Sequence, residues 1–233
     1  MKKQIVIATI KTWNIEQAKE IKKNLSAKYN ITIIDKKENL TRDKLIKLNP
    51  DYIFFTHWSW IIPANIYEEF TCIVFHSTDL PFGRGGSPLQ NLIVNKVYQT
   101  KISAIKVQKG LDTGPIYVQI PISIKKGSAK EIFIKISKII FNKMIPLILE
   151  KNMIPRPQKG IITEFKRRTP EMSNLLLAKI ETIDDLYDFI RMLDGEGYPT
   201  AFIKLSKKIT IKLAHAKKIS SGLKGQFEVI YEK

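Results

Sequence analysis

The sequence of 233 residues is poor in cysteine, in histidine and in long apolar runs. Its one cysteine, Cys72, cannot build a disulfide framework or a cysteine-based metal site. Its three histidines, His57, His76 and His215, lack the spacing of metal ligands, so no metal is expected. The first apolar run, Ile5 to Ile10, is far too short for a membrane span and no export signal follows. We therefore expect a cytoplasmic protein without membrane attachment.

Acidic residues are also scarce, with 22 Asp and Glu against 39 Lys and Arg and a net charge of +17. Such a charge suits nucleic acid or a phosphorylated substrate, or it reflects lysine as the default surface residue. The lysines are spread along the whole chain, and no basic stripe interleaved with aromatics is present, which favours the second explanation. The densest cluster, Lys166 to Arg168, falls in a predicted connector.

Strand and helix patterns alternate through the first 70 residues. Three apolar runs, Ile5 to Ile10, Ile31 to Ile34 and Tyr52 to Phe55, predict strands covered on both faces. Two helices are predicted between them, the first capped by Asn14 and the second by Thr41. This order predicts an α/β fold with a doubly wound, mostly parallel, Rossmann-like sheet. No Gly-x-Gly-x-x-Gly follows the first strand, so NAD is not expected.

The rest of the chain is predicted to add strands, one long helix and a small second region. Further strands are expected over residues 72–75, 103–107 and 116–120, and a helix over residues 128–150 with a kink at Pro146. Pro155 and Pro157 interrupt regular structure, which places a boundary between a larger domain, 1–155, and a linker with a small C-terminal α+β extension, 156–233. Within that extension we expect a helix at 184–193 and strands at 201–203, 210–214 and 227–231.

Two glycine-containing loops are candidates for a functional site. The first, His76 to Pro88, follows a buried strand and holds a histidine that can move a proton near neutral pH and an arginine, Arg84, that can hold an anion. A core histidine before an ordinary tight loop is the alternative interpretation. The second loop, Gly110 to Pro115, places Asp112 between glycines at the mouth of the predicted sheet, where ligands bind in open α/β folds.

Together the two loops resemble the folate-dependent formyltransferase family, which includes methionyl-tRNA formyltransferase and the sugar-nucleotide N-formyltransferases. That family reads Asn-x-His-x-Ser-Leu-Leu-Pro-x-x-Arg-Gly and then, a few tens of residues later, Asp-x-Gly. This chain supplies His76, Leu80, Pro81, Arg84, Gly85, Asp112 and Gly114 in register. One position departs from the pattern, because Val74 stands where the family has Asn.

The resemblance implies transfer of a formyl group from 10-formyltetrahydrofolate to an amine. His76 would hold or protonate the oxyanion, and Asp112 would orient His76 or relay the proton. The residues that the resemblance assigns to the folate are Leu80, Pro81, Val107, Gly110, Leu111 and Gly114. Those that it assigns to the substrate are Thr78, Arg84, Gly85, Gly86 and Trp58. Trp58 and its neighbour His57 either line a ligand pocket or pack under the next helix.

The sequence says less about which amine accepts the formyl group than about the reaction. The short C-terminal region and the diffuse charge favour a nucleotide-linked amino-deoxysugar over tRNA. Methionyl-tRNA formyltransferase is the alternative enzyme, and a folate- or nucleotide-binding protein that lost turnover together with the Asn is the non-catalytic alternative. Thr78, Gln90 and Asn91 are candidates to replace the missing amide. A homodimer is compatible with all of these.

Overall fold

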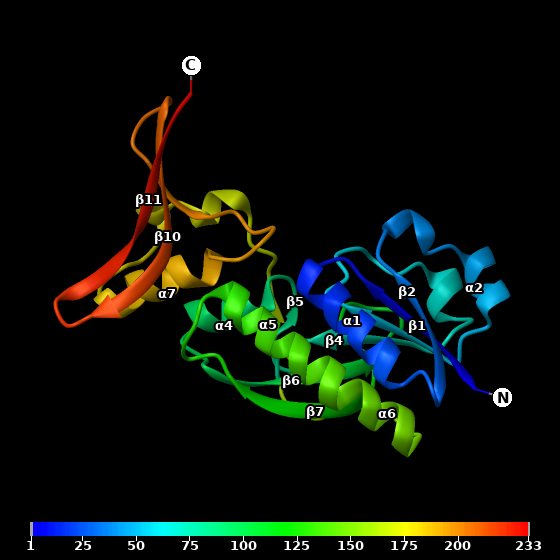
Figure 1. Ribbon diagram of the computed structural model, residues 1–233. Coiled ribbons are helices and arrows are strands. Elements are labelled where there is room, and N and C mark those ends of the chain that lie inside the picture. Colours follow the sequence, from blue (N-terminus) through cyan, green and yellow to red (C-terminus); the bar gives the residue numbers. More distant parts are fainter. Residues whose placement is uncertain (1, 233) are drawn as a thin grey trace. The chain divides into compact units, whose positions relative to one another are not determined.

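The computed structural model describes residues 2–232, and their contacts divide the chain into two compact units (Figure 1). The first unit comprises the chain up to Arg84 with Lys101–Ile122 and Ile134–Thr163, and the second comprises Gly85–Thr100, Ser123–Phe133 and the chain from Glu164 onward. Each unit is thus assembled from three separate segments of the chain. The predicted boundary near residue 155 divides the chain at a single point, and it stays a prediction.

The first unit contains a six-stranded sheet in the order β2-β1-β3-β4-β6-β7. The strands are β1 (Lys3–Thr9), β2 (Tyr29–Ile34), β3 (Tyr52–Thr56), β4 (Cys72–His76), β6 (Gln99–Lys106) and β7 (Ile116–Ser123). Strand β1 pairs in parallel with β2 and β3, β3 pairs in parallel with β4, and β6 runs antiparallel to β4. The predicted α/β fold with a mostly parallel sheet is confirmed.

The two predicted helices of the first half of the chain, α1 and α2, are present together with two short ones, and one predicted cap differs. They are α1 (Thr12–Asn24), the 3-10 turn η1 (Lys37–Asn39), α2 (Arg42–Leu48) and α3 (Ala64–Tyr67). Thr41 caps α2 as predicted, accepting from the backbone N–H of Lys44 at 3.3 Å. The predicted cap at Asn14 is wrong, because α1 begins after Lys11 and buries Asn14 inside its first turns.

The predicted long helix is present as α5 (Ala129–Ile139), a π-helical turn η2 (Ile140–Met144) and α6 (Ile145–Lys151). Ser128 and Glu131 form a reciprocal cap at its start, with hydrogen bonds of 3.3 and 2.8 Å between side chain and backbone N–H. The π turn ends at Met144, two residues before Pro146, which has no N–H to donate to the preceding turn. The structure therefore has a widened turn beside this proline, and the predicted kink itself stays a prediction.

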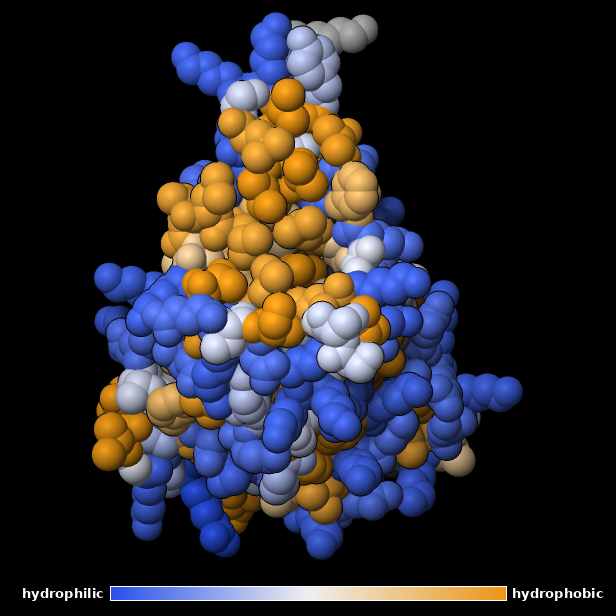
Figure 2. All heavy atoms as spheres, turned by 90° about the vertical axis from the view of Figure 1, so that its left-hand side faces the viewer, coloured by the Kyte–Doolittle hydropathy of each residue, from blue (hydrophilic) through white to orange (hydrophobic). Residues whose placement is uncertain are grey.

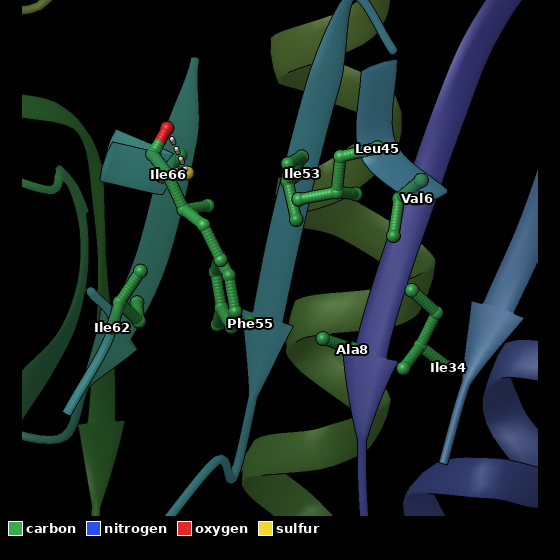
Figure 3. Close-up of a cluster of buried hydrophobic side chains, with 9 residues drawn as sticks. Val6, Ala8, Ile34, Leu45, Ile53, Phe55, Ile62 and Ile66 are labelled. Carbon is green, nitrogen blue, oxygen red and sulfur yellow. Dashed lines mark hydrogen bonds between the residues drawn. The ribbon is translucent and has the colours of Figure 1, made fainter. Parts of the chain in front are cut away.

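Apolar side chains from the strands and helices of the first unit form its core (Figure 3). The cluster consists of Val6, Ala8, Ile34, Leu45, Ile53, Phe55, Ile62, Ile66 and Cys72. Burial raises the pKa of the Cys72 thiol to about 12, so this cysteine is an inert packing residue. The continuous apolar runs in the sequence are explained by a sheet that is covered on both faces.

The second unit combines short helices with a small antiparallel sheet in the order β11-β10-β9. Its helices are α4 (Pro88–Val94), η3 (Pro170–Ser173), η4 (Leu175–Leu177) and α7 (Ile183–Leu193), and its strands are β9 (Ala201–Lys204), β10 (Ile209–Ile219) and β11 (Gly222–Tyr231). Two further two-residue strands, β5 (Arg84–Gly85) and β8 (Glu164–Phe165), pair with each other. The predicted C-terminal α+β extension is confirmed.

A buried ion pair fixes α7 within this unit. Arg191 is 1% exposed; its Nε donates to Asp188 at 2.7 Å and its Nη1 donates to the carbonyls of Ile124 and Gly127 at 3.1 and 2.9 Å. Lys96 also donates to the Asp188 carboxylate, at 2.9 Å. Because a buried charge without partners is costly, these contacts make α7 the element that joins three separate segments of the unit.

Candidate active site

His76 ends β4 and lies between two hydrogen-bond acceptors. Its side chain is nearly buried, and Nε2 lies 2.8 Å from the carbonyl oxygen of Gly83. Because a carbonyl can only accept, Nε2 carries the proton in this contact. The other ring nitrogen, Nδ1, lies 3.5 Å from Oδ2 of Asp112. The two predicted catalytic residues are therefore neighbours although 36 positions separate them in the sequence.

Asp112 sits in the loop between β6 and β7 with a left-handed backbone, at a φ of +53°. Aspartate tolerates this region better than most residues, but such a conformation is maintained only where its surroundings hold it. Gly110 is also left-handed, at +98°, and the Thr113 hydroxyl lies 3.0 Å from the Lys109 carbonyl. The tight loop thus turns the Asp112 carboxylate back toward His76.

The carbonyl of Gly83 also accepts a hydrogen bond from the hydroxyl of Thr78, at 3.2 Å. Thr78 is fully buried, and its own carbonyl accepts from the Ser103 hydroxyl at 2.7 Å. The amide of Gln119 reaches the same place, donating to Ser103 at 2.9 Å and to Asp79 at 3.1 Å. These contacts fix the loop after β4, and Thr78 holds the same carbonyl that orients His76.

Gln158 is a site residue that the sequence interpretation missed. Its amide oxygen accepts from Nε and Nη2 of Arg84 at 3.1 and 2.8 Å, and its amide nitrogen donates to the carbonyls of Asp112 and Gly114, both at 2.8 Å. One side chain therefore joins the arginine of the first loop to the strained Asp112 loop. The sequence around Pro157 predicts only a connector, and a lone polar residue beside two prolines is the one signal that could have indicated more.

The predicted folate residues differ in burial and in the contacts that they make. Leu80 is buried next to a cis peptide bond with Pro81. The backbone N–H of Val107 donates to the Cys72 carbonyl at 2.8 Å. A Cβ at Gly114 would lie 1.7 Å from the Lys106 carbonyl oxygen, so only glycine fits there. Leu111 is 68% exposed at the tip of the loop, which leaves its side chain accessible to a ligand.

The predicted substrate residues are divided between the two units. Thr78, Arg84 and Trp58 belong to the first unit, whereas Gly85 and Gly86 belong to the second. A Cβ at Gly85 would lie 2.4 Å from the Phe165 carbonyl oxygen, and one at Gly86 would lie 2.6 Å from the Arg167 Cβ. Both glycines are thus required by close packing of the chain. Their assignment to the substrate stays a prediction.

Trp58 and His57 make packing contacts with other aromatic side chains, and whether they line a ligand pocket stays a prediction. Trp58 packs against the apolar cluster, with its ring 5.9 Å from that of Phe55 and 4.9 Å from that of Trp60. His57 is left-handed, at a φ of +52°, and lies edge-on to Trp13 with ring centres 5.8 Å apart. Burial lowers the pKa of His57 to about 4, so its ring is neutral at physiological pH.

The two amides considered as substitutes for the missing Asn are engaged elsewhere. The Gln90 amide donates to the Met192 carbonyl at 3.2 Å, and the Asn91 amide donates to the carbonyls of Gly86 and Lys166 at 2.9 and 3.0 Å. Val74 itself is packed against the apolar cluster. Of the three candidates, Thr78 is the one hydrogen-bonded to the same carbonyl as His76.

Within residues 2–232, no group of three or more His, Cys, Asp or Glu side chains is arranged to hold a metal ion. No helix in that described range has the length and hydropathy needed to cross a bilayer.

Comparison with known proteins decides the family. Residues 5–137 match the family described as "Formyl transferase". The chain belongs to the formyl transferase family. Residues 170–230 match a second family, described as "Methionyl-tRNA formyltransferase, C-terminal domain". The first matched region contains the two loops that carried the resemblance.

The curated relatives with similar sequences bear the name methionyl-tRNA formyltransferase. One from Campylobacter jejuni serotype O:6 is 27% identical over 170 residues, which is 72% of this chain and 54% of the relative. One from Dictyoglomus thermophilum is 32% identical over 136 residues, which is 55% of this chain and 44% of the relative. The chain spans about half the length of the curated relatives it matches.

Similar solved structures cover nearly all of the chain. "Methionyl-tRNA formyltransferase from Clostridium thermocellum" has a TM-score of 0.94 and 50% identity, covering 99% of this chain and 100% of that one. A sugar N-formyltransferase from Shewanella sp. has a TM-score of 0.72 at 14% identity, with 93% and 98% covered. HypX from Aquifex aeolicus in complex with tetrahydrofolic acid has a TM-score of 0.71 at 15% identity, with 91% and 37% covered. The last two show a shared fold.

Proposed function

We propose that this chain transfers a formyl group from 10-formyltetrahydrofolate to an amine, with methionyl-tRNA as the first acceptor to test. The observation that carries the proposal is the pairing of His76 with Asp112 at 3.5 Å in a member of the formyl transferase family. The presence of tetrahydrofolic acid in the related HypX structure supports the donor. The names of the proteins with similar sequence support the acceptor.

The chemistry follows from the two residues. The amine nitrogen attacks the formyl carbon, and the carbonyl oxygen gains negative charge in the tetrahedral intermediate. The ring of His76 donates a hydrogen bond to that oxygen, which requires the Nε2 proton to leave the Gly83 carbonyl. Asp112 accepts the proton that the attacking nitrogen loses, directly or through a water. The bond from the formyl carbon to N10 then breaks, and N10 takes up a proton.

The acceptor proposed here differs from the one that the sequence favoured. A short C-terminal region indicated an amino sugar, but the relative from Clostridium thermocellum combines the same extent with the name methionyl-tRNA formyltransferase. The net charge of +17 also suits an RNA acceptor. In the basic cluster, Lys166 and Arg167 are exposed, while Arg168 is partly buried and donates to the Met172 carbonyl at 2.6 Å. Two of the three charges are thus accessible to phosphate.

A nucleotide-linked amino-deoxysugar is the second candidate acceptor. One observation supports testing it: the chain shares its fold with the Shewanella sugar N-formyltransferase, with a TM-score of 0.72. The two candidates predict different salt dependence, because a tRNA acceptor releases counterions on binding and loses affinity steeply as salt rises.

The test supplies the protein with 10-formyltetrahydrofolate and, separately, with methionyl-tRNA and a panel of nucleotide-linked amino sugars. Formylated product is measured by mass spectrometry, with Asp112→Asn as the matched control. Product with methionyl-tRNA alone supports the first acceptor, and product with a sugar alone replaces it by the second.

Folate binding without product from any acceptor would favour the non-catalytic alternative. Hydrogen exchange measures, independently of product formation, where the folate donor binds. We expect protection of Val107 to Asp112 when a folate analogue is added, because the family resemblance assigns this segment to the pterin. Protection confined to the last third of the chain would contradict the assignment.

A further inference from the structure

The second unit contains a cavity lined by residues of α4, η3, η4 and α7, all of which belong to that unit. Its volume is about 280 Å³. Two of the side chains that line it, Phe189 and Met192 of α7, are buried. An engineered apolar cavity of roughly 150 Å³ binds benzene, so this cavity can hold an aromatic ring together with a short side arm.

Other apolar side chains that line the cavity are open to solvent. The exposed fractions are 47% for Val94, 45% for Met172 and 71% for Leu177. Figure 2 faces the side on which α7, β10 and β11 are drawn in Figure 1, and it shows that hydrophobic side chains gather on that side of the molecule. Single exposed apolar residues are normal, but several that converge on one cavity are typical of a ligand site. The cavity therefore suits a ligand with an apolar body.

Two aspartates that line the cavity already receive several hydrogen bonds each. Asp185 accepts from Lys96 at 2.7 Å and from the backbone N–H and hydroxyl of Thr182 at 2.9 and 2.8 Å. Asp188 accepts from Lys96 at 2.9 Å and from Arg191 at 2.7 Å. A cationic ligand would have to compete with these lysine and arginine side chains for the carboxylates. The chemistry of the cavity therefore disfavours an amine.

Arg168 lines the same cavity and has an unused hydrogen-bond donor. Its Nη2 donates to the Met172 carbonyl at 2.6 Å, whereas its Nε is buried without an acceptor among the residues that the structure describes. Burial lowers the pKa of Arg168 from its ordinary value, which reflects a guanidinium that has lost part of its hydration. A buried donor without an acceptor is destabilising, so an acceptor supplied by a ligand would be favoured. Carboxylates match the guanidinium fork.

We propose that this cavity binds a small apolar monocarboxylate, whose ring or branched chain contacts the apolar lining and whose carboxylate pairs with Arg168. A single negative charge is specified because Glu171, Asp185 and Asp188 line the same cavity and would repel a phosphate dianion. A neutral apolar molecule would leave the Arg168 donor without an acceptor. These residues have no part in the formyl transfer proposed above, so this binding site does not depend on that function.

The test titrates 3-phenylpropionate into the full chain, with the methionine methyl groups carbon-13 labelled for NMR. Met172 and Met192 line the cavity, whereas Met144 is buried in the first unit. We expect the signals of Met172 and Met192 to shift saturably, with a dissociation constant of about 0.1 to 1 mM, while that of Met144 stays in place. 3-Phenylpropanamide has the same shape without the charge and should bind at least about tenfold more weakly.

Variants of two adjacent arginines test the role of the guanidinium. Arg168→Gln should raise the dissociation constant of 3-phenylpropionate at least about tenfold. Arg167→Gln removes the same charge from an exposed neighbour and should leave the constant within about twofold. If Arg168→Gln does not fold, Leu177→Asp provides a second test at an exposed position, because it sets a negative charge beside the ligand and should weaken the acid by at least about tenfold.

The results that would overturn the proposal concern both the site and the charge of the ligand. Signals of Met172 and Met192 that do not shift, or an Arg168→Gln variant that binds 3-phenylpropionate like the wild type, would exclude the site. Equal affinity for the acid, its amide and 3-phenylpropylamine would exclude recognition of a carboxylate. Tighter binding of the amine would assign the cavity to a cation. Inorganic phosphate that binds as well as the acid would contradict the requirement for an apolar body and a single charge.

Discussion

Nδ1 of His76 lies 3.5 Å from Oδ2 of Asp112, while Nε2 of the same ring lies 2.8 Å from the carbonyl oxygen of Gly83. A carboxylate on one side and a carbonyl on the other fix the ring plane. The ring can donate to both only when both nitrogens carry protons. The imidazole is thus held between a group that can exchange a proton and a group that only orients it.

We expect His76→Ala and Asp112→Asn each to lower formyl transfer by about two to four powers of ten. His76 has no Asn neighbour to share the oxyanion, since Val74 occupies that position, so the loss for His76→Ala should be the larger. Steady-state rates with saturating donor provide the measurement, and thermal unfolding shows whether the fold is retained. Either variant keeping near wild-type rates would remove that residue from the mechanism.

Gln158→Ala should lower the turnover number by roughly tenfold while folate binding changes little, because the side chain positions Asp112 through its backbone and does not itself touch the reacting atoms. Gln158→Glu keeps the acceptor for Arg84 but replaces the amide donor that holds the carbonyls of Asp112 and Gly114. We therefore expect Gln158→Glu to be as impaired as Gln158→Ala. The split between turnover number and Michaelis constant for the acceptor measures the effect.

A matched control for this position is Gln108→Ala. Gln108 contacts the same loop only through the carbonyl and hydroxyl of Thr113, both at 3.4 Å, and its side chain is exposed. It should leave the rate nearly unchanged, because we expect the pterin to lie against the backbone of residues 107–112 and not against the Gln108 side chain. A loss equal to that of Gln158→Ala would mean that any loosening of the loop has the same effect, which would contradict a specific positioning role for Gln158.

Val74→Asn should not simply raise activity. Val74 packs against the apolar cluster, and an amide introduced there must find partners or cost about 1 to 3 kcal/mol. Thr78→Val should be harmful because it removes the hydroxyl from the Gly83 carbonyl. Rates for the two single variants and the double variant measure whether the positions are coupled. A large gain from Val74→Asn with a silent Thr78→Val would favour the non-catalytic alternative for the wild-type chain.

Stability should fall between about pH 6.5 and pH 4 partly because of His57. Burial lowers its pKa to about 4 from an ordinary value of 6.5, so the unfolded chain binds this proton first as the pH falls. The neutral folded form therefore loses stability through that interval, by up to about 3 kcal/mol from this group, and no further below it. His57→Asn tolerates the left-handed backbone and does not titrate. Its unfolding free energy should depend less steeply on pH, as denaturant titrations at a series of pH values would show.

The pattern of apolar residues by itself determined the fold class. The runs beginning at Ile5, Ile31 and Tyr52 are continuous and short, as in strands covered on both faces, and a parallel sheet follows from the helices between them. Thr41 indicated the start of its helix because a capping hydroxyl acts on the next turn alone. The two loops around His76 and Asp112 could also be recognised, since glycines and a polar residue directly after an apolar strand are local features.

What the tertiary structure decided is which distant residues meet. Asparagine commonly caps helices, yet α1 begins before Asn14 and buries its side chain. Gln158 lies 46 positions from Asp112, and no local pattern in the chain marks their contact. Phe227, Val229 and Tyr231 alternate as a half-buried strand should, but only the arrangement of the sheet shows that their side chains remain exposed. Local periodicity records which face of an element is apolar, whereas packing alone determines what covers that face.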